Sequence, residues 1–147
     1  MEYMLKADDL VGVSFWIISV SMVASTAFFF LEGNSVAKHW QTSVRVAGLV
    51  TLIAAIHYYY MRAVWVQTGE NPNVFRYIDW LLTVPLQMVE FYLILAAVGA
   101  ATAGMFWRLL IGTLVMLIAG FLGENGSINV TVGFIAVSYT HLRAHET

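Results

Sequence analysis

The sequence contains no cysteine and few charged residues, and both shortages narrow what the protein can be. Without cysteine, the chain of 147 residues cannot build a disulfide scaffold or a cysteine-based zinc site, and we predict no metal site. Charged residues make up 11% of the chain, against about 25% in a typical soluble domain. The net charge of −2 provides no basic surface, so we predict no nucleic-acid partner. These shortages exclude most soluble folds.

What the sequence has in abundance is apolar surface. Hydrophobic residues make up 60% of the chain and aromatic residues 14%, which excludes intrinsic disorder. The first nine residues are polar and acidic, and they lack the basic start and apolar core of a secretion signal. We therefore predict that a lipid bilayer surrounds most of the folded chain.

Long apolar runs predict membrane-spanning helices. Leu10 to Leu31 carries no formal charge, and at about 1.5 Å per residue it is long enough to cross a hydrocarbon layer of about 30 Å. Similar runs follow, separated by polar turns. The predicted helices are 10–31, 43–66, 74–98, 105–122 and a partial fifth at 127–137. The fold class is therefore an all-α membrane protein, with one transmembrane domain over residues 1–137.

The last ten residues break this pattern. Ser138 to Thr147 includes Arg143, His145 and Glu146, where a membrane span should continue. We interpret this divergent tail either as a short polar end or as non-native sequence foreign to the gene. Basic residues also favour one orientation, because Lys38 and Arg108 lie in the first and third loops. By the positive-inside rule this places the N-terminus outside.

The predicted third helix carries two acidic residues inside the membrane. A carboxylate at the centre of a span costs roughly 2.5 to 3.5 kcal/mol on insertion scales. Asp79 and Glu90 are eleven residues apart, about three helical turns, so both should project from one face about 16 Å apart. Thr83 and Gln87 fall near the same face, and Arg76 lies one turn before Asp79. Such a polar line is suited to proton relay, whereas a single buried acid equally fits an ion pair or a helix-packing hydrogen bond.

His57, in the predicted second helix, has two interpretations. A lone histidine in a membrane helix is more often a hydrogen-bonding group between helices than a proton-handling residue. A proton-handling role for His57 is favoured only if Asp79 lies within reach, since an imidazole can stabilise an ionised acid.

Several segments resemble one known family. The segment FRYIDWLLTVPLQMVEFYLIL at 75–95 closely resembles the third helix of proteorhodopsins, the bacterial light-driven proton pumps of the microbial rhodopsin family. VGVSFW at 11–16, FFFLE at 28–32 and HYYYMRAVWVQT at 57–68 are similar to that family's first two helices, in the same order and spacing. The resemblance implies a seven-helix bundle, of which this chain would supply four complete helices and part of a fifth.

The resemblance also implies roles for individual residues. Asp79 matches the counterion and primary proton acceptor, and Glu90 matches the proton donor on the cytoplasmic side. His57 matches the partner of the acceptor, and Arg76 matches the arginine on the exit path. Three further positions match retinal-pocket residues, the last of them the spectral-tuning position, where glutamine is associated with blue absorption: Trp80, Thr83 and Gln87.

One expected residue is missing. The family holds all-trans retinal as a Schiff base on a lysine of its seventh helix, whereas this sequence has only Lys6 and Lys38, both outside the predicted spans. The resemblance therefore implies a C-terminally truncated piece of a retinal-binding, outward proton pump, in which covalent retinal cannot form. It implies a transporter and photoreceptor rather than an enzyme, placed in a bacterial inner membrane, with protons as cargo and a homo-oligomeric parent.

Two alternatives stay open. A sensory or channel-type microbial rhodopsin is one, although Glu90 argues against a sensor because sensors commonly lack the donor carboxylate. The other is that these 147 residues alone form a non-functional membrane helix fragment.

Overall fold

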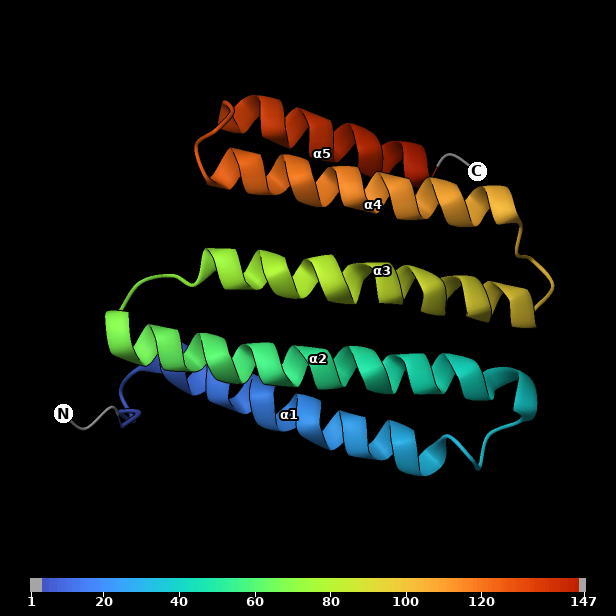
Figure 1. Ribbon diagram of the computed structural model, residues 1–147, viewed down its shortest axis with the longest axis horizontal. Helices are drawn as coiled ribbons and strands as arrows, with labels where there is room; N and C mark the ends of the chain where they lie inside the picture. The colour runs from blue at the N-terminus through green and yellow to red at the C-terminus, as the bar shows by residue number, and fades with distance from the viewer. Residues whose placement is uncertain (1–3, 146–147) are drawn as a thin grey trace. The chain divides into compact units, whose positions relative to one another are not determined.

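The computed structural model describes residues 4–145, with side chains described through residue 139. Within that range the chain forms five α-helices and no strand (Figure 1). Their bounds are α1 Leu10–Glu32, α2 Lys38–Thr68, α3 Asn73–Ala97, α4 Ala103–Glu124 and α5 Val130–His145. The predicted all-α class is confirmed.

The first four predicted helices are confirmed, and most of their ends are longer than predicted, whereas α3 stops at Ala97 rather than 98. The largest difference is at α2, which begins at Lys38 rather than 43 and ends at Thr68 rather than 66. Apolar length indicates only the part of a helix that can lie in hydrocarbon, whereas the helix itself continues through polar residues until its backbone geometry changes. That change comes at Gly69, whose φ of 67° is left-handed and whose N–H donates to the carbonyl oxygen of Trp65.

The predicted bounds of the fifth helix, 127–137, are wrong at both ends. The Asn129 Oδ1 atom accepts a hydrogen bond from the Thr131 N–H at 2.8 Å, so α5 begins after this residue rather than at Ser127. It then continues to His145, because neither proline nor glycine interrupts residues 138–145. The interpretation of residues 138–147 as a polar end or as foreign sequence stays a prediction. The last two lie outside the described range.

Four helices meet the requirements for crossing a membrane. Among the described residues, α1, α2, α3 and α4 are each long and apolar enough to span a bilayer. Many of their large apolar side chains are exposed, including Ile17 on α1, Leu82 on α3 and Trp107 on α4. Exposed apolar surface of this extent is suited to lipid. The chain is a multi-pass membrane protein.

The chain divides into two compact units. The first contains Met1–Thr83, and the second contains Val84–Thr147. The division falls inside α3, two residues before Pro85, through which the helix continues. The prediction of a single domain over residues 1–137 stays a prediction.

In the first unit, α1 packs along α2 (Figure 1). The buried side chains of the two helices include Phe15 on α1 and the small Ala54 and Ala55 on α2, and Met61 on α2 is completely buried. Gly48 lets α2 approach α1 closely, because a Cβ there would lie 3.2 Å from the Phe30 ring. The first turns of α3 join this unit through side chains, which positions the candidate site described below.

In the second unit, α4 packs along α5. The two helices approach closely at Gly133, where an added Cβ would lie 3.3 Å from the Ala119 carbonyl oxygen and 3.4 Å from the Gly123 Cα. Two glycines therefore allow these helix backbones to approach closely, as small residues do in membrane bundles.

Candidate functional site

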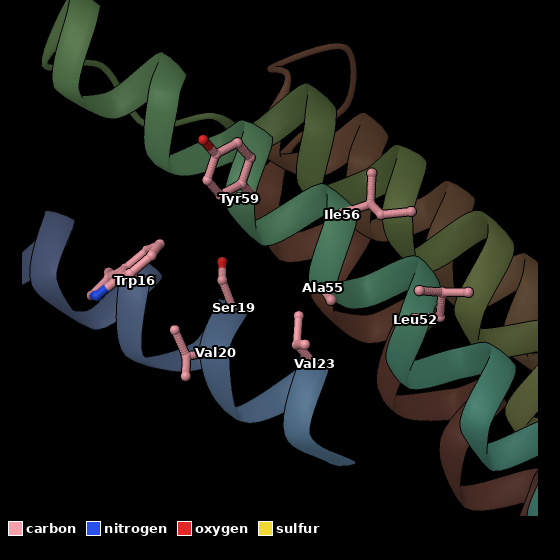
Figure 2. A pocket seen from close by; sticks show the side chains of 8 residues that line it. All are labelled: Trp16, Ser19, Val20, Val23, Leu52, Ala55, Ile56 and Tyr59. Atoms are coloured by element: carbon pink, nitrogen blue, oxygen red, sulfur yellow. The ribbon is translucent and has the colours of Figure 1, made fainter. Parts of the chain in front are cut away.

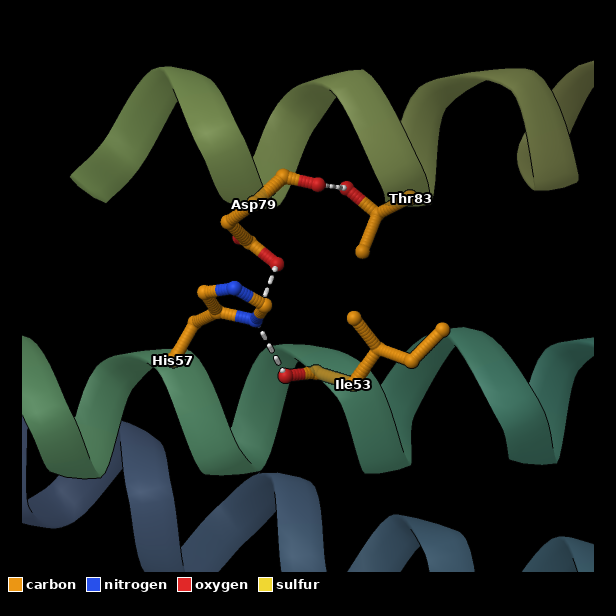
Figure 3. Close-up of polar contacts among 4 residues, drawn as sticks. All are labelled: Ile53, His57, Asp79 and Thr83. Atoms are coloured by element: carbon orange, nitrogen blue, oxygen red, sulfur yellow. Dashed lines mark hydrogen bonds and ion pairs between the residues drawn. The ribbon is translucent and has the colours of Figure 1, made fainter. Parts of the chain in front are cut away.

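The candidate site is built around Asp79 of α3. Its side chain faces α2 and the residue is only 2% exposed (Figure 3). The Oδ1 atom lies 3.4 Å from Nδ1 of His57, which α2 contributes. A buried carboxyl group is costly unless it has a partner, so this pairing stabilises Asp79 in its position. The condition set by the sequence, that His57 must lie within reach of Asp79, is met.

A backbone carbonyl group orients the His57 ring. The Nδ1 atom of His57 lies 2.9 Å from the carbonyl oxygen of Ile53, one turn earlier in α2. Because a carbonyl oxygen only accepts, Nδ1 must carry the proton in this contact. The same N–H also faces Asp79 Oδ1, which can accept.

Thr83 extends the site by one turn of α3. Its Oγ1 donates to the backbone carbonyl oxygen of Asp79 at 2.9 Å, and the residue is buried (Figure 3). This is a common way for a threonine to satisfy its hydroxyl inside a helix. Asp79 Oδ1 has no hydrogen bond among the described residues, so it can accept one more donor.

Arg76 is not paired with the candidate acceptor. Its Nη2 donates to Asn71 Oδ1 at 2.9 Å, in the turn that precedes α3. The alternative that Asp79 forms a structural ion pair with this arginine therefore has no support here. Trp80 is half-buried, with its ring 5.1 Å from the Tyr77 ring in an edge-to-face arrangement.

Gln87 and Glu90 belong to the second unit. Gln87 is exposed and Glu90 is half-buried on α3. The predicted polar line from Arg76 to Glu90 crosses the division between the units, so it stays a prediction.

Sequence reasoning missed the part played by Ile53. It contributes a backbone carbonyl, and every residue has one, so its identity gives no signal. The separation of four residues from His57 was the available clue, because a helical side chain can reach the carbonyl one turn earlier.

Comparisons with known proteins identify relatives of the chain. Residues 9–142 match the profile of the bacteriorhodopsin-like protein family. The blue-light absorbing proteorhodopsin of Gamma-proteobacterium Hot 75m4 is 58% identical over 131 residues, covering 89% of this chain and 52% of the relative. The green-light absorbing proteorhodopsin of Gamma-proteobacterium EBAC31A08 is 54% identical, covering 89% of this chain and 53% of the relative.

A solved structure agrees with this assignment. The crystal structure of the blue light-absorbing proteorhodopsin from Med12 matches with a TM-score of 0.82 and 53% identity. The match covers 92% of this chain and 64% of that one. The chain thus spans about half the length of the relatives it matches in sequence. The resemblance to proteorhodopsins predicted from the segments at 11–16, 28–32, 57–68 and 75–95 is confirmed.

Proposed function

The chain belongs to the bacteriorhodopsin-like protein family, and we propose that it forms the part of a retinal-binding, light-driven outward proton pump that carries the proton acceptor and the proton donor. The proposed protein is a transporter and photoreceptor rather than an enzyme. We further propose a bacterial inner membrane as its location, an outward N-terminus, and a homo-oligomeric parent.

The observation that carries this proposal is the buried pair of Asp79 and His57. The N–H of His57 faces Asp79 Oδ1, with Nδ1 at 3.4 Å from this oxygen. Asp79 Oδ1 has no hydrogen bond of normal geometry among the described residues. A carboxylate held in this way can accept a proton and can release it again when the charge around it changes. We therefore propose Asp79 as the acceptor and His57 as the residue that orients it.

The other site residues take roles consistent with their positions. Arg76, held by Asn71 at the start of α3, is proposed to guide the released proton toward the outer surface. Glu90, farther along α3, is proposed to resupply a proton from the inner side. Gln87 is the proposed spectral-tuning position.

The described residues fit one side of a retinal site. Asp79 supplies a buried carboxyl group beside His57, and Trp80 and Thr83 lie on the same helix, α3. Retinal, when bound, would supply the absorption of light. Attachment is not supported by this chain, because Lys6 precedes α1 and Lys38 begins α2, 19 residues before His57, or about 28 Å along the helix. For these 147 residues alone we propose membrane insertion without covalent retinal.

A chimera tests the proposed roles. Residues 1–137 would be joined to the remaining helices of the blue-light absorbing relative, so that an attachment lysine is supplied. We expect illuminated cells with retinal to acidify their medium. Asp79→Asn should abolish this acidification because the acceptor is lost, whereas Glu124→Gln, which changes an exposed acid at the end of α4, should leave it unchanged.

The chain itself provides a second test. Retinal would be added to membranes that contain the 147 residues, and the protein would then be denatured. We expect no visible absorption that persists after denaturation. A covalent pigment in that experiment, or full pumping by the Asp79→Asn chimera, would contradict the proposal.

A further inference from the structure

An apolar groove lies between α1 and α2, in the first unit (Figure 2). Its volume is about 500 Å³. It is lined by Trp16, Ser19, Val20 and Val23 of α1, and by Leu52, Ala55, Ile56 and Tyr59 of α2. Both helices are membrane-spanning candidates, so this groove opens where lipid is the surrounding medium.

One polar group in the groove has no partner. Ser19 is only 4% exposed, and its Oγ has no hydrogen bond among the described residues. Serines elsewhere in α1 behave differently, since Ser21 and Ser25 donate to carbonyl groups one turn earlier. Figure 2 shows the Ser19 hydroxyl directed into the space between the helices. A buried hydroxyl without a partner is unfavourable, so the groove is suited to a ligand that offers an acceptor at this level.

A cation lies at one end of the groove. The Arg62 guanidinium carbon is 5.3 Å from the centre of the Trp16 ring and 5.9 Å from the centre of the Tyr59 ring, and both rings line the groove. The Arg62 Nε atom is buried without a hydrogen-bond partner among the described residues. Arg62 is six residues from the end of α2, about 9 Å along the helix, within reach of the lipid headgroups. This end of the groove is complementary to an anion.

We propose that the groove binds an anionic phospholipid, with its phosphate at Arg62, an ester carbonyl oxygen at Ser19 and one acyl chain along the apolar walls. Ser19 lies three residues deeper in α1 than Trp16, about 4.5 Å along the helix, as an ester group lies deeper than the phosphate. From Tyr59 to Leu52 the groove follows seven residues of α2, about 10 Å of apolar wall for the chain.

Native mass spectrometry of the purified chain in mild detergent tests this proposal. We expect the chain to retain phosphatidylglycerol in preference to phosphatidylcholine with matched acyl chains. Arg62→Gln should lower the affinity for phosphatidylglycerol about fivefold, the effect of one basic residue near a membrane surface. The control is Arg45→Gln, which removes an exposed arginine that is bonded to Asn34 and does not line the groove, and it should leave the affinity unchanged.

Two further variants test the placement of the lipid. Ser19→Ala should remove the preference for ester-linked over ether-linked phosphatidylglycerol, because the hydroxyl no longer donates. Val20→Trp should fill the groove from an exposed position and displace the acyl chain. Circular dichroism of each variant checks that the helical content is unchanged.

Several results would overturn the proposal. Equal retention of the two phospholipids, equal effects of Arg62→Gln and Arg45→Gln, or an unchanged ester preference in Ser19→Ala would each do so. A disulfide between two copies of the Val20→Cys variant, together with loss of bound phosphatidylglycerol, would instead identify a second copy of the chain as the occupant.

Discussion

The two helix pairs of the molecule are joined in different ways. Between α1 and α2, the hydroxyl oxygens of Thr26 and Thr51 lie 2.9 Å apart, and Trp65 Nε1 donates to both carboxylate oxygens of Asp9 at 3.0 and 3.1 Å. Between α4 and α5, the close contact is steric, because Gly133 lies against the backbone of α4. Both pairs approach closely at a glycine, Gly48 in the first and Gly133 in the second, and the first pair adds polar contacts between its helices.

The first pair places polar groups between its helices even though the surrounding medium is apolar. The first unit, which contains Asp79 and His57, keeps hydrogen-bonding groups between its helices, and Thr26 and Asp79 each have a partner on α2. In a membrane, burial of apolar surface does not by itself drive helices together, so packing and hydrogen bonds determine which helices associate. Substitutions in the two pairs should therefore act through different mechanisms.

The largest effect is expected at the steric contact. Gly133→Leu places a side chain against the backbone of α4, which cannot move aside, and should lower the free energy of unfolding by about 3 kcal/mol. Unfolding from mild detergent into dodecyl sulfate, followed by circular dichroism, measures this change. Gly104→Leu is the control, since an added Cβ there meets nothing within 4 Å. Equal effects of the two variants would mean that α4 and α5 do not approach closely at Gly133.

The next largest effect is expected at the site. His57→Phe removes the N–H that faces Asp79 and should lower the free energy of unfolding by about 2 kcal/mol, because a buried polar group loses its partner. In a double-mutant cycle with Asp79→Asn, the coupling should be about 1 kcal/mol. His39→Phe, at an exposed position, is the matched control. Zero coupling would show that the two side chains do not interact.

A smaller effect is expected at Asp9. Its Oδ1 accepts from the Gly12 N–H at 2.9 Å and so caps α1, while the carboxylate also accepts from Trp65. Asp9→Ala should lower the free energy of unfolding by about 1.5 kcal/mol, since both contacts disappear. Unfolding from mild detergent into dodecyl sulfate measures this loss of free energy. Asp8→Ala, at an exposed neighbouring residue, should have little effect on the free energy of unfolding. An equal decrease in Asp8→Ala would show that Asp9 does not connect the two helices.

The smallest effect is expected at the threonine pair. Thr26→Val should lower the free energy of unfolding by about 0.6 kcal/mol, the average value for a hydrogen bond between membrane helices. Thr113→Val is a suitable comparison, because the Thr113 hydroxyl bonds to carbonyl groups of its own helix at Leu109 and Leu110. A loss at Thr113 as large as that at Thr26 would remove the distinction between the two helix pairs.

Much of the fold follows from the sequence because lipid imposes a simple requirement. A chain in hydrocarbon must satisfy its backbone groups internally, so apolar runs such as 10–31 and 105–122 predict helices directly. The ends were harder to predict. The start of α2 at Lys38 and the end of α5 at His145 lie among polar residues, where apolar length gives no information.

The candidate site was only partly predictable. Asp79 and His57 stand out because ionisable residues are rare in apolar helices. Their contact depends on how α3 lies against α2, which no spacing along one helix reveals. Arg76 is an example of a contact that spacing does not predict. Its position one turn before Asp79 suggests an ion pair between the two side chains, whereas the Arg76 side chain bonds to Asn71.

Infrared difference spectroscopy of the illuminated chimera tests the central claim that Asp79 is the buried group that accepts the transported proton. We expect a carboxylic acid carbonyl band that appears in the light, is absent in Asp79→Asn and persists in Glu124→Gln. A light-induced band of unchanged intensity in Asp79→Asn would contradict it.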